Sequence, residues 1–198
     1  FDPQGSGRAD SSISLAGLQI AARTVERVHF STSGTAAAHR FALEFNAAPV
    51  KLHGGGTGSF ADGVWHAQFG EFSASDDADM QLRLSAPAAL LIALNGEQLR
   101  LERLCLEGQP AALCAAGERL LGRSAIELSA ARVPLRALTA GLSSDTSFEG
   151  QVSLDLRAQA PAGAPWSAAF IGALADASVR HRLGSGRIET FNLGNGDV

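Results

Sequence analysis

Short runs in which apolar and polar residues alternate are the feature that most limits how this chain folds. Residues 41–45, 80–84, 126–128 and 152–156 place apolar side chains at every second position, with Glu, Gln, Arg, Asp, Ala or Ser between them. A period of two puts successive side chains on opposite faces of a β-strand. The pattern therefore predicts strands that have one apolar face and one polar face.

Turn-forming residues separate these runs. Clusters of Gly, Asn, Asp, Ser and Pro occur at residues 53–58, 76–77, 95–96, 108–110 and 184–186. Asn95-Gly96 is a strong signal for a two-residue hairpin turn. The segment 86–94 is better interpreted as a strand than as a helix, because Pro87 and the Asn-Gly pair leave little room for helical turns. About a dozen strands at roughly 8–15-residue spacing indicate an antiparallel meander.

One segment departs from the strand pattern. Leu135, Leu138 and Leu142 follow Pro134 with the spacing of a helical face, and Pro suits the first turn of a helix. This predicts one short helix at about residues 134–142. The sequence thus predicts a single all-β unit over residues 1–198, an antiparallel sheet with one short helix.

The two cysteines carry information about strand register. If Gln109 and Pro110 form the centre of a hairpin turn, Cys105 lies directly opposite Cys114, within the distance that a disulfide tolerates. The disulfide would then lie on the polar face. Leu99 and Leu101 could rejoin the apolar face only through a bulge near residues 102–103. The alternative is two reduced cysteines in a cytosolic core, whereas a disulfide indicates an oxidising compartment.

Charge and hydropathy exclude some classes of protein. The formal net charge is −4, and Lys51 is the single lysine among scattered arginines, so no basic stripe is available for nucleic acid. No run reaches the roughly 18 apolar residues of a membrane helix, the nearest being residues 86–94. The chain starts at Phe1 without an initiator Met, from which we expect a segment of a longer protein.

Glycine-rich motifs offer weak signals for catalysis or nucleotide binding. Residues 53–56 match the oxyanion loop of lipases, but no G-x-S-x-G nucleophile motif accompanies them. Residues 56–61 fit a loose dinucleotide fingerprint, yet a strand pattern follows where a helix is needed. Lys51 lacks the spacing of a phosphate-binding loop. These motifs therefore indicate neither an enzyme nor the binding of a nucleotide cofactor.

Metal binding is also not indicated. None of the five histidines is paired at a metal-ligand spacing; they are His29, His39, His53, His66 and His181. The acidic residues Asp76, Asp77 and Asp79 lack the Gly and the terminal Glu of a calcium loop. We predict no metal site and no pair of acid and base catalysts.

An apolar sheet face must be covered, and the sequence alone does not determine what covers it. A closed soluble sandwich or barrel is one solution. An outer-membrane barrel is disfavoured because its aromatic girdles have no counterpart in a chain with two Trp and no Tyr. The third solution is a sheet curled into an open trough whose lining is covered by apolar ligands. A dozen strands at ~4.8 Å spacing would make such a trough about 55 Å long.

Several motifs in order resemble the TamB family of Gram-negative envelopes. They are the Trp-containing run 64–72, the segment 80–90, the Leu-Cys-Leu and Leu-Cys pair within 104–117, and a Pro-Leu element at 133–138 followed by a Gly-led strand at 148–156. The similarity extends from about His39 to Val198. Each motif is loose, and their order together is more specific than any one of them.

The resemblance implies a fold and a cellular role. TamB-like proteins are long periplasmic chains that are anchored in the inner membrane and reach an outer-membrane barrel partner, TamA. Their curled sheet, the β-taco, has an apolar interior, and the family is assigned to outer-membrane protein insertion and to phospholipid passage. It has no catalytic residues to carry over. The resemblance therefore implies a curled antiparallel sheet, a β-taco-like segment with an open apolar groove.

On this basis we expect a groove that binds and conducts phospholipid acyl chains, or alternatively a scaffold that binds unfolded outer-membrane protein strands. No cofactor is expected apart from phospholipid or detergent held in the groove, and no nucleic acid partner. The expected lining is Phe41, Leu43, Phe45, Leu52, Leu82, Leu84, Leu104, Leu106, Leu113, Ile126, Leu128, Val152, Leu154 and Leu156.

Overall fold

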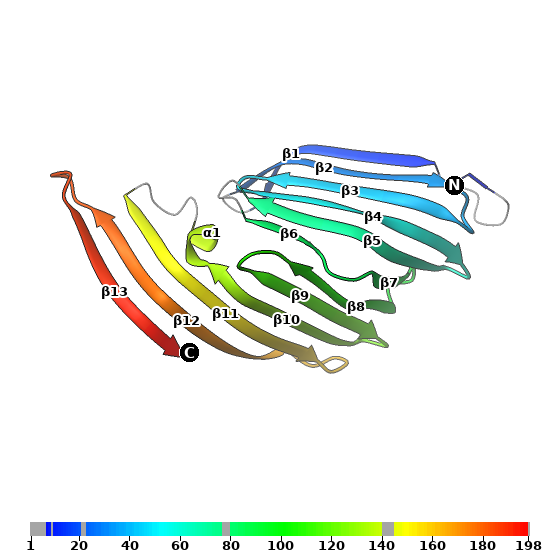
Figure 1. Ribbon diagram of the computed structural model, residues 1–198. Coiled ribbons are helices and arrows are strands. Elements are labelled where there is room, and N and C mark those ends of the chain that lie inside the picture. Colours follow the sequence, from blue (N-terminus) through cyan, green and yellow to red (C-terminus); the bar gives the residue numbers. More distant parts are fainter. Residues whose placement is uncertain (1–6, 9, 21–22, 77–79, 140–144, 198) are drawn as a thin grey trace.

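One antiparallel sheet of 13 strands makes up almost the whole structure (Figure 1). The computed structural model describes residues 7–8, 10–20, 23–76, 80–139 and 145–197. The strands are β1 (Ser11–Ile20), β2 (Arg23–Gly34), β3 (His39–Ala47), β4 (Val50–Ala61), β5 (Val64–Asp76), β6 (Gln81–Leu84), β7 (Ala88–Ala93), β8 (Gln98–Glu107), β9 (Ala112–Leu120), β10 (Arg123–Pro134), β11 (Thr146–Ala160), β12 (Ser167–Arg182) and β13 (Ile188–Asp197). The expected all-β meander is confirmed.

The strands follow chain order across the sheet, with one interruption. Both β6 and β7 pair with β5 on one side and with β8 on the other, so together they occupy a single strand position. The break between them at residues 85–87 contains Pro87, which has no N–H group to donate to a ladder. Ser85 instead donates its backbone N–H to the carbonyl of Cys105, at 3.0 Å.

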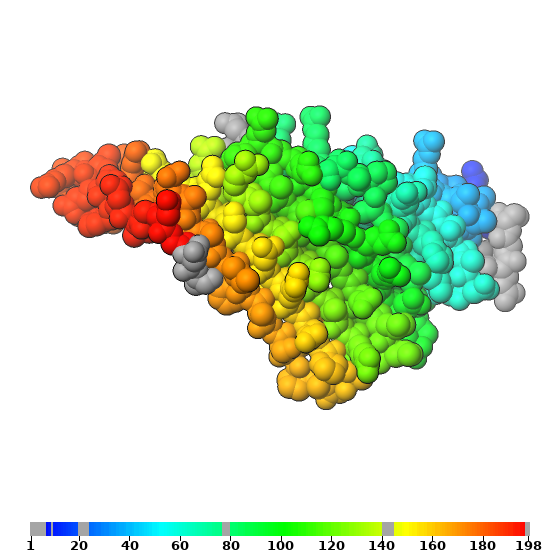
Figure 2. Space-filling view, turned by 60° about the horizontal axis from the view of Figure 1, so that its bottom comes forward, coloured from blue at the N-terminus to red at the C-terminus, as the bar shows by residue number. Residues whose placement is uncertain are grey.

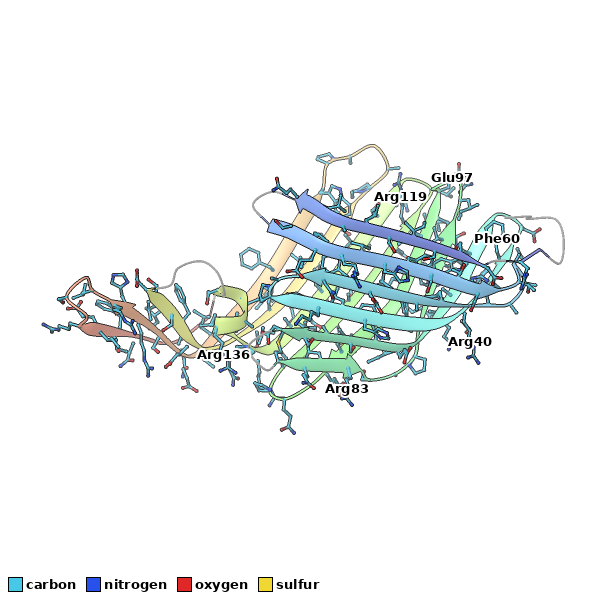
Figure 3. All side chains as sticks on the ribbon, turned by 90° about the horizontal axis from the view of Figure 1, so that it is seen from above. Arg40, Phe60, Arg83, Glu97, Arg119 and Arg136 are labelled. Atoms are coloured by element: carbon cyan, nitrogen blue, oxygen red, sulfur yellow. A yellow bond between two sulfur atoms is a disulfide. The ribbon has the colours of Figure 1, made fainter. Side chains whose placement is uncertain are left out.

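The sheet curls over itself. In Figure 1 the strands β1–β5 lie above β8–β11, and Figure 3, seen from above, shows that the same strands cross over them. Register shifts flank the interrupted strand, between Gly55 and Gly56 in the β4–β5 ladder and between Leu101 and Leu104 in the β8–β9 ladder. Extra residues of this kind bend a strand and increase its twist. The curl is thus built from bulges placed on both sides of the break.

The β8–β9 hairpin has the register expected from the sequence. Cys105 pairs with Cys114 and Leu106 with Leu113, and the two cysteines form a disulfide. The bulge expected near residues 102–103 lies between Leu101 and Leu104. The hairpin expected at residues 95–96 is also present and centred on these residues, but the connection between β7 and β8 is four residues long, 94–97, and not two.

Two local expectations need correction. Residues 53–58 do not form a turn but lie within β4, paired with β3 and β5. The turn between β4 and β5 is Asp62-Gly63, where both residues have positive φ, as a tight hairpin turn requires. The expected helix is present as α1 (Leu135–Thr139), but Pro134 ends β10 instead of starting the helix, and residues 140–142 lie outside the described part of the chain.

Candidate functional site

The apolar residues expected to line a groove lie on one face of the sheet, which we call the inner face. Phe45 pairs with Leu52 in the β3–β4 ladder, and Leu128 pairs with Leu156 in the β10–β11 ladder. Directly paired residues point to the same side of a sheet, and so do residues two apart along a strand. Followed through all the ladders, this rule places all fourteen residues on the inner face.

Part of the inner face is a closed core. Leu82 is 1% exposed, Phe41 5% and Leu106 6%, which side chains on an uncovered sheet face cannot be. Ala111 and Val133 are buried with them. From β3 to β8, and at the Val133 end of β10, the curl therefore closes on its own side chains, and these residues stabilise the fold as an ordinary hydrophobic core.

Aromatic rings fill this closed region because β4 is rich in glycine. Gly54, Gly56 and Gly58 lie on the inner face of β4, opposite Leu43, Phe41 and His39 of β3. A Cβ added at Gly54 would lie 2.7 Å from Cδ2 of Phe72, so the ring occupies the space above the glycine.

The rings also contact one another. The Phe41 ring centroid is 5.3 Å from that of Phe69 and 5.5 Å from that of Trp65, both in edge-on geometry. Edge-on pairs are favourable for aromatic rings at this separation. The alternation pattern alone did not identify Trp65, Phe69 or Phe72 as members of this cluster, since the bulge at Gly70 shifts the parity between the last two.

His39 is the buried polar residue of this region, at 8% exposure. The indole N–H of Trp65 donates to its Nε2 at 2.8 Å, which makes Nε2 an acceptor. Nδ1 lies 3.1 Å from the carbonyl oxygen of Thr35 and can donate its proton there. Both ring nitrogens therefore have partners within the protein, which fixes His39 as a structural residue that holds Trp65 in place.

The other part of the inner face is open. Ile126 is 40% exposed, Leu128 41% and Leu154 37%, although all three lie on the apolar face of the sheet. Phe170 of β12 pairs with Leu156 and is 60% exposed, and Phe191 of β13 is 56% exposed. Figure 2 shows that the orange and red C-terminal strands project to one side of the rest of the molecule. An apolar surface therefore remains uncovered along β10–β13.

The outer face is polar over the same strands. Glu127 and Arg157 alternate with the inner leucines and pair across β10 and β11, with 3.7 Å between Arg157 Nε and Glu127 Oε1. The disulfide lies on this face too, since Cys114 is paired with Ser129 of β10. An exception is Ile171, which follows Phe170 and is 73% exposed on the outer face.

The structure gives no support to the weak catalytic motifs. The glycines of residues 54–56 are committed to the ladders of β4, so their backbone groups do not form an anion-binding loop. In the described ranges, no three His, Cys, Asp or Glu side chains gather as metal ligands would. The same part of the chain contains no helix with the length and hydropathy to span a membrane.

The comparison with protein families decides the identity of this apolar sheet. A family model described as the N-terminal domain of TamB matches residues 2–180. The chain belongs to the TamB family. No curated protein and no solved structure matches it. The family is a transport and assembly module rather than a class of enzymes, and membership suggests a periplasmic segment.

Proposed function

We propose that this TamB segment binds phospholipid acyl chains on the open inner face of β10–β13 and lets them slide between membranes. The observation that carries the proposal is the exposure of Ile126, Leu128, Leu154 and Phe170, a continuous set of apolar side chains that the chain itself leaves uncovered. Exposed apolar surface on this scale marks an interaction site.

Binding would be passive. An acyl chain that leaves an apolar surface for water loses about 0.8 kcal/mol per CH₂ group, which holds it in the groove. Movement from one strand to the next exchanges one leucine contact for another, so sliding costs little. The headgroup stays in water. The segment itself supplies no direction of travel, because it provides no energy source.

The closed region limits where this transport takes place. Phe41, Leu82 and Leu106 are too buried to contact a lipid. Of the fourteen residues expected to line a groove, the exposed ones in β10 and β11 fit the lipid-binding role best. In the full-length protein we place the segment in the periplasm, with an inner-membrane anchor and the outer-membrane barrel TamA as parts of the same route.

A second candidate function has its own support. β1 and β13 end the sheet among the described residues, and both carry exposed apolar side chains, such as Ile13 at 58% and Leu193 at 59%. The edge of a sheet can accept an additional strand from a partner. A scaffold that holds unfolded outer-membrane protein strands would use these edges.

The test is the lipid content of the gently purified protein, measured by mass spectrometry. We expect co-purified phospholipid in the wild type and its loss in Leu128→Asp and Leu154→Asp, because a carboxylate in the groove is costly beside an acyl chain. Wild-type lipid content in both variants would contradict the groove. Binding of unfolded strand peptides without any lipid would support the scaffold instead.

A further inference from the structure

A separate apolar cavity lies on the inner face, away from the open strands. Its volume is about 410 Å³, and its apolar lining is Phe30, Phe60, Trp65, Ile92 and Leu94. Phe60, labelled in Figure 3, lies near the end of β4, and Leu94 belongs to the connection between β7 and β8. The backbone N–H of Leu94 donates to the carbonyl of Gly63, at 2.9 Å, which holds these two turns together.

The inner end of this cavity is blocked. Phe41 and Phe69 are 5% and 9% exposed and stand edge-on to each other, beside Trp65. Trp65 is also 6.5 Å from Phe30, measured between ring centroids and again edge-on. Its hydrogen bond to His39 fixes the indole. A ligand in the cavity therefore meets a fixed aromatic wall at Trp65 and cannot pass along the inner face.

The size of the cavity fits one hydrocarbon chain. An apolar cavity of about 150 Å³ accommodates benzene, and by the same proportion this cavity holds on the order of 16 carbon atoms. Its volume also lies within the range of about 300–1,000 Å³ that is common for small-molecule sites.

Polar groups are concentrated on the side of the cavity formed by β1 and β2. Ser11 and Thr32 share a hydrogen bond of 2.9 Å there. Arg8 lies beside them, 88% exposed, and its Nε is 3.2 Å from Asp10. A guanidinium carries further N–H donors that suit a phosphate. One end of the site is thus apolar and closed by aromatic rings, while the other is polar and includes the exposed ion pair of Arg8 and Asp10.

We infer that this cavity binds one acyl chain of a phospholipid, with the phosphate near Arg8 and the chain terminus against Trp65. The inference rests on the proposed function and adds to it a bound lipid that stays in place. This site holds its lipid, whereas the open strands β10–β13 let theirs move. The aromatic cluster of Phe41, Phe69 and Phe72 separates the two.

Tryptophan fluorescence tests this inference because the chain has only two tryptophans, Trp65 and Trp166. Trp166→Phe, at a residue 54% exposed, leaves Trp65 as the reporter. The probe is a phosphatidylglycerol with bromine atoms near the ends of its acyl chains. Bromine quenches only at contact, so we expect this lipid to quench Trp65 and the unbrominated lipid to leave it bright.

Two turn leucines provide a matched pair. Leu94→Asp places a charge at the cavity, and because that site is 69% exposed the fold should tolerate it. Leu121→Asp, at a residue 74% exposed in the β9–β10 turn, is the control. We expect Leu94→Asp to bind the brominated lipid about tenfold more weakly, as measured by quenching of Trp65. This corresponds to a cost of about 1.4 kcal/mol for a charge beside the acyl chain. The control should match the Trp166→Phe background.

The outcomes separate this site from the groove. Unquenched Trp65 at saturating brominated lipid would overturn the inference, even if mass spectrometry finds lipid that is lost in Leu128→Asp. Quenching that Leu94→Asp weakens and Leu121→Asp does not would support it, whether or not Leu128→Asp changes the lipid content. Equal quenching in both turn variants would show contact elsewhere and would also overturn it.

Discussion

The inner face is closed from β3 to β8 and at the Val133 end of β10, and it is open along the rest of β10–β13, although the same alternating pattern encodes both regions. Leu82 in the closed region is 1% exposed, whereas Leu128 in the open region is 41% exposed. The difference lies in what surrounds them. The closed region has aromatic rings above the inner glycines of β4, while the inner face of β10–β12 combines leucines with small residues such as Ala158 and Gly172.

This comparison shows what alternation does and does not determine. A period of two decides which face of a sheet is apolar, and here it did so for strands throughout the chain. Whether that face is then covered depends on side-chain volume and on bulges that bend the strands. In this TamB segment, one part of a single sheet therefore forms a closed core, and another part leaves its apolar side chains exposed.

The largest expected effect compares one leucine from each region. Leu82→Ala should lower the free energy of unfolding by about 2–5 kcal/mol, because it leaves a cavity in a packed core. Leu128→Ala should lower it by only about 0.5 kcal/mol, as for a surface substitution. Urea unfolding followed by circular dichroism measures both. Equal losses would mean that the two regions are packed alike.

A smaller effect is expected from the glycines that make room for the rings. A Cβ at Gly56 would overlap the carbonyl oxygen of Gln68 and touch Phe41, so Gly56→Ala should cost about 1–3 kcal/mol. Gly70→Ala is the matched control, since no atom lies within 4 Å of its added Cβ. Thermal unfolding of the two variants compares them. If Gly56→Ala were as stable as the control, the close approach of Gln68 and Phe41 to β4 would not require glycine at position 56.

Sequence reasoning succeeded where local chemistry fixes register. The turn centred on Gln109 and Pro110 determines the pairs of the β8–β9 hairpin from the turn as far as the bulge, and so Cys105 was correctly placed opposite Cys114. The bulge that returns Leu101 to the inner face followed from the same count.

Sequence reasoning failed where the role of a residue depends on side chains from neighbouring strands. The glycines of residues 53–58 looked like a turn, but they lie in a strand and leave space for rings from β3 and β5. The real turn, Asp62-Gly63, carried an Asp-Gly signal that the alternation of the following residues obscured. The division into closed and open regions could not be predicted, because it depends on how far the curl brings distant strands together.

The most direct test of the central claim, that acyl chains cover the open inner face, is photocrosslinking at two neighbouring residues of β12. Phe170 faces inward and Ile171 outward, and both are exposed, at 60% and 73%. A photoreactive amino acid at either position should leave stability nearly unchanged, within about 0.5 kcal/mol. After irradiation in cells and mass spectrometry of the peptides, we predict phospholipid adducts at position 170 and none at position 171. Equal labelling at the two positions, or none at position 170, would contradict the account.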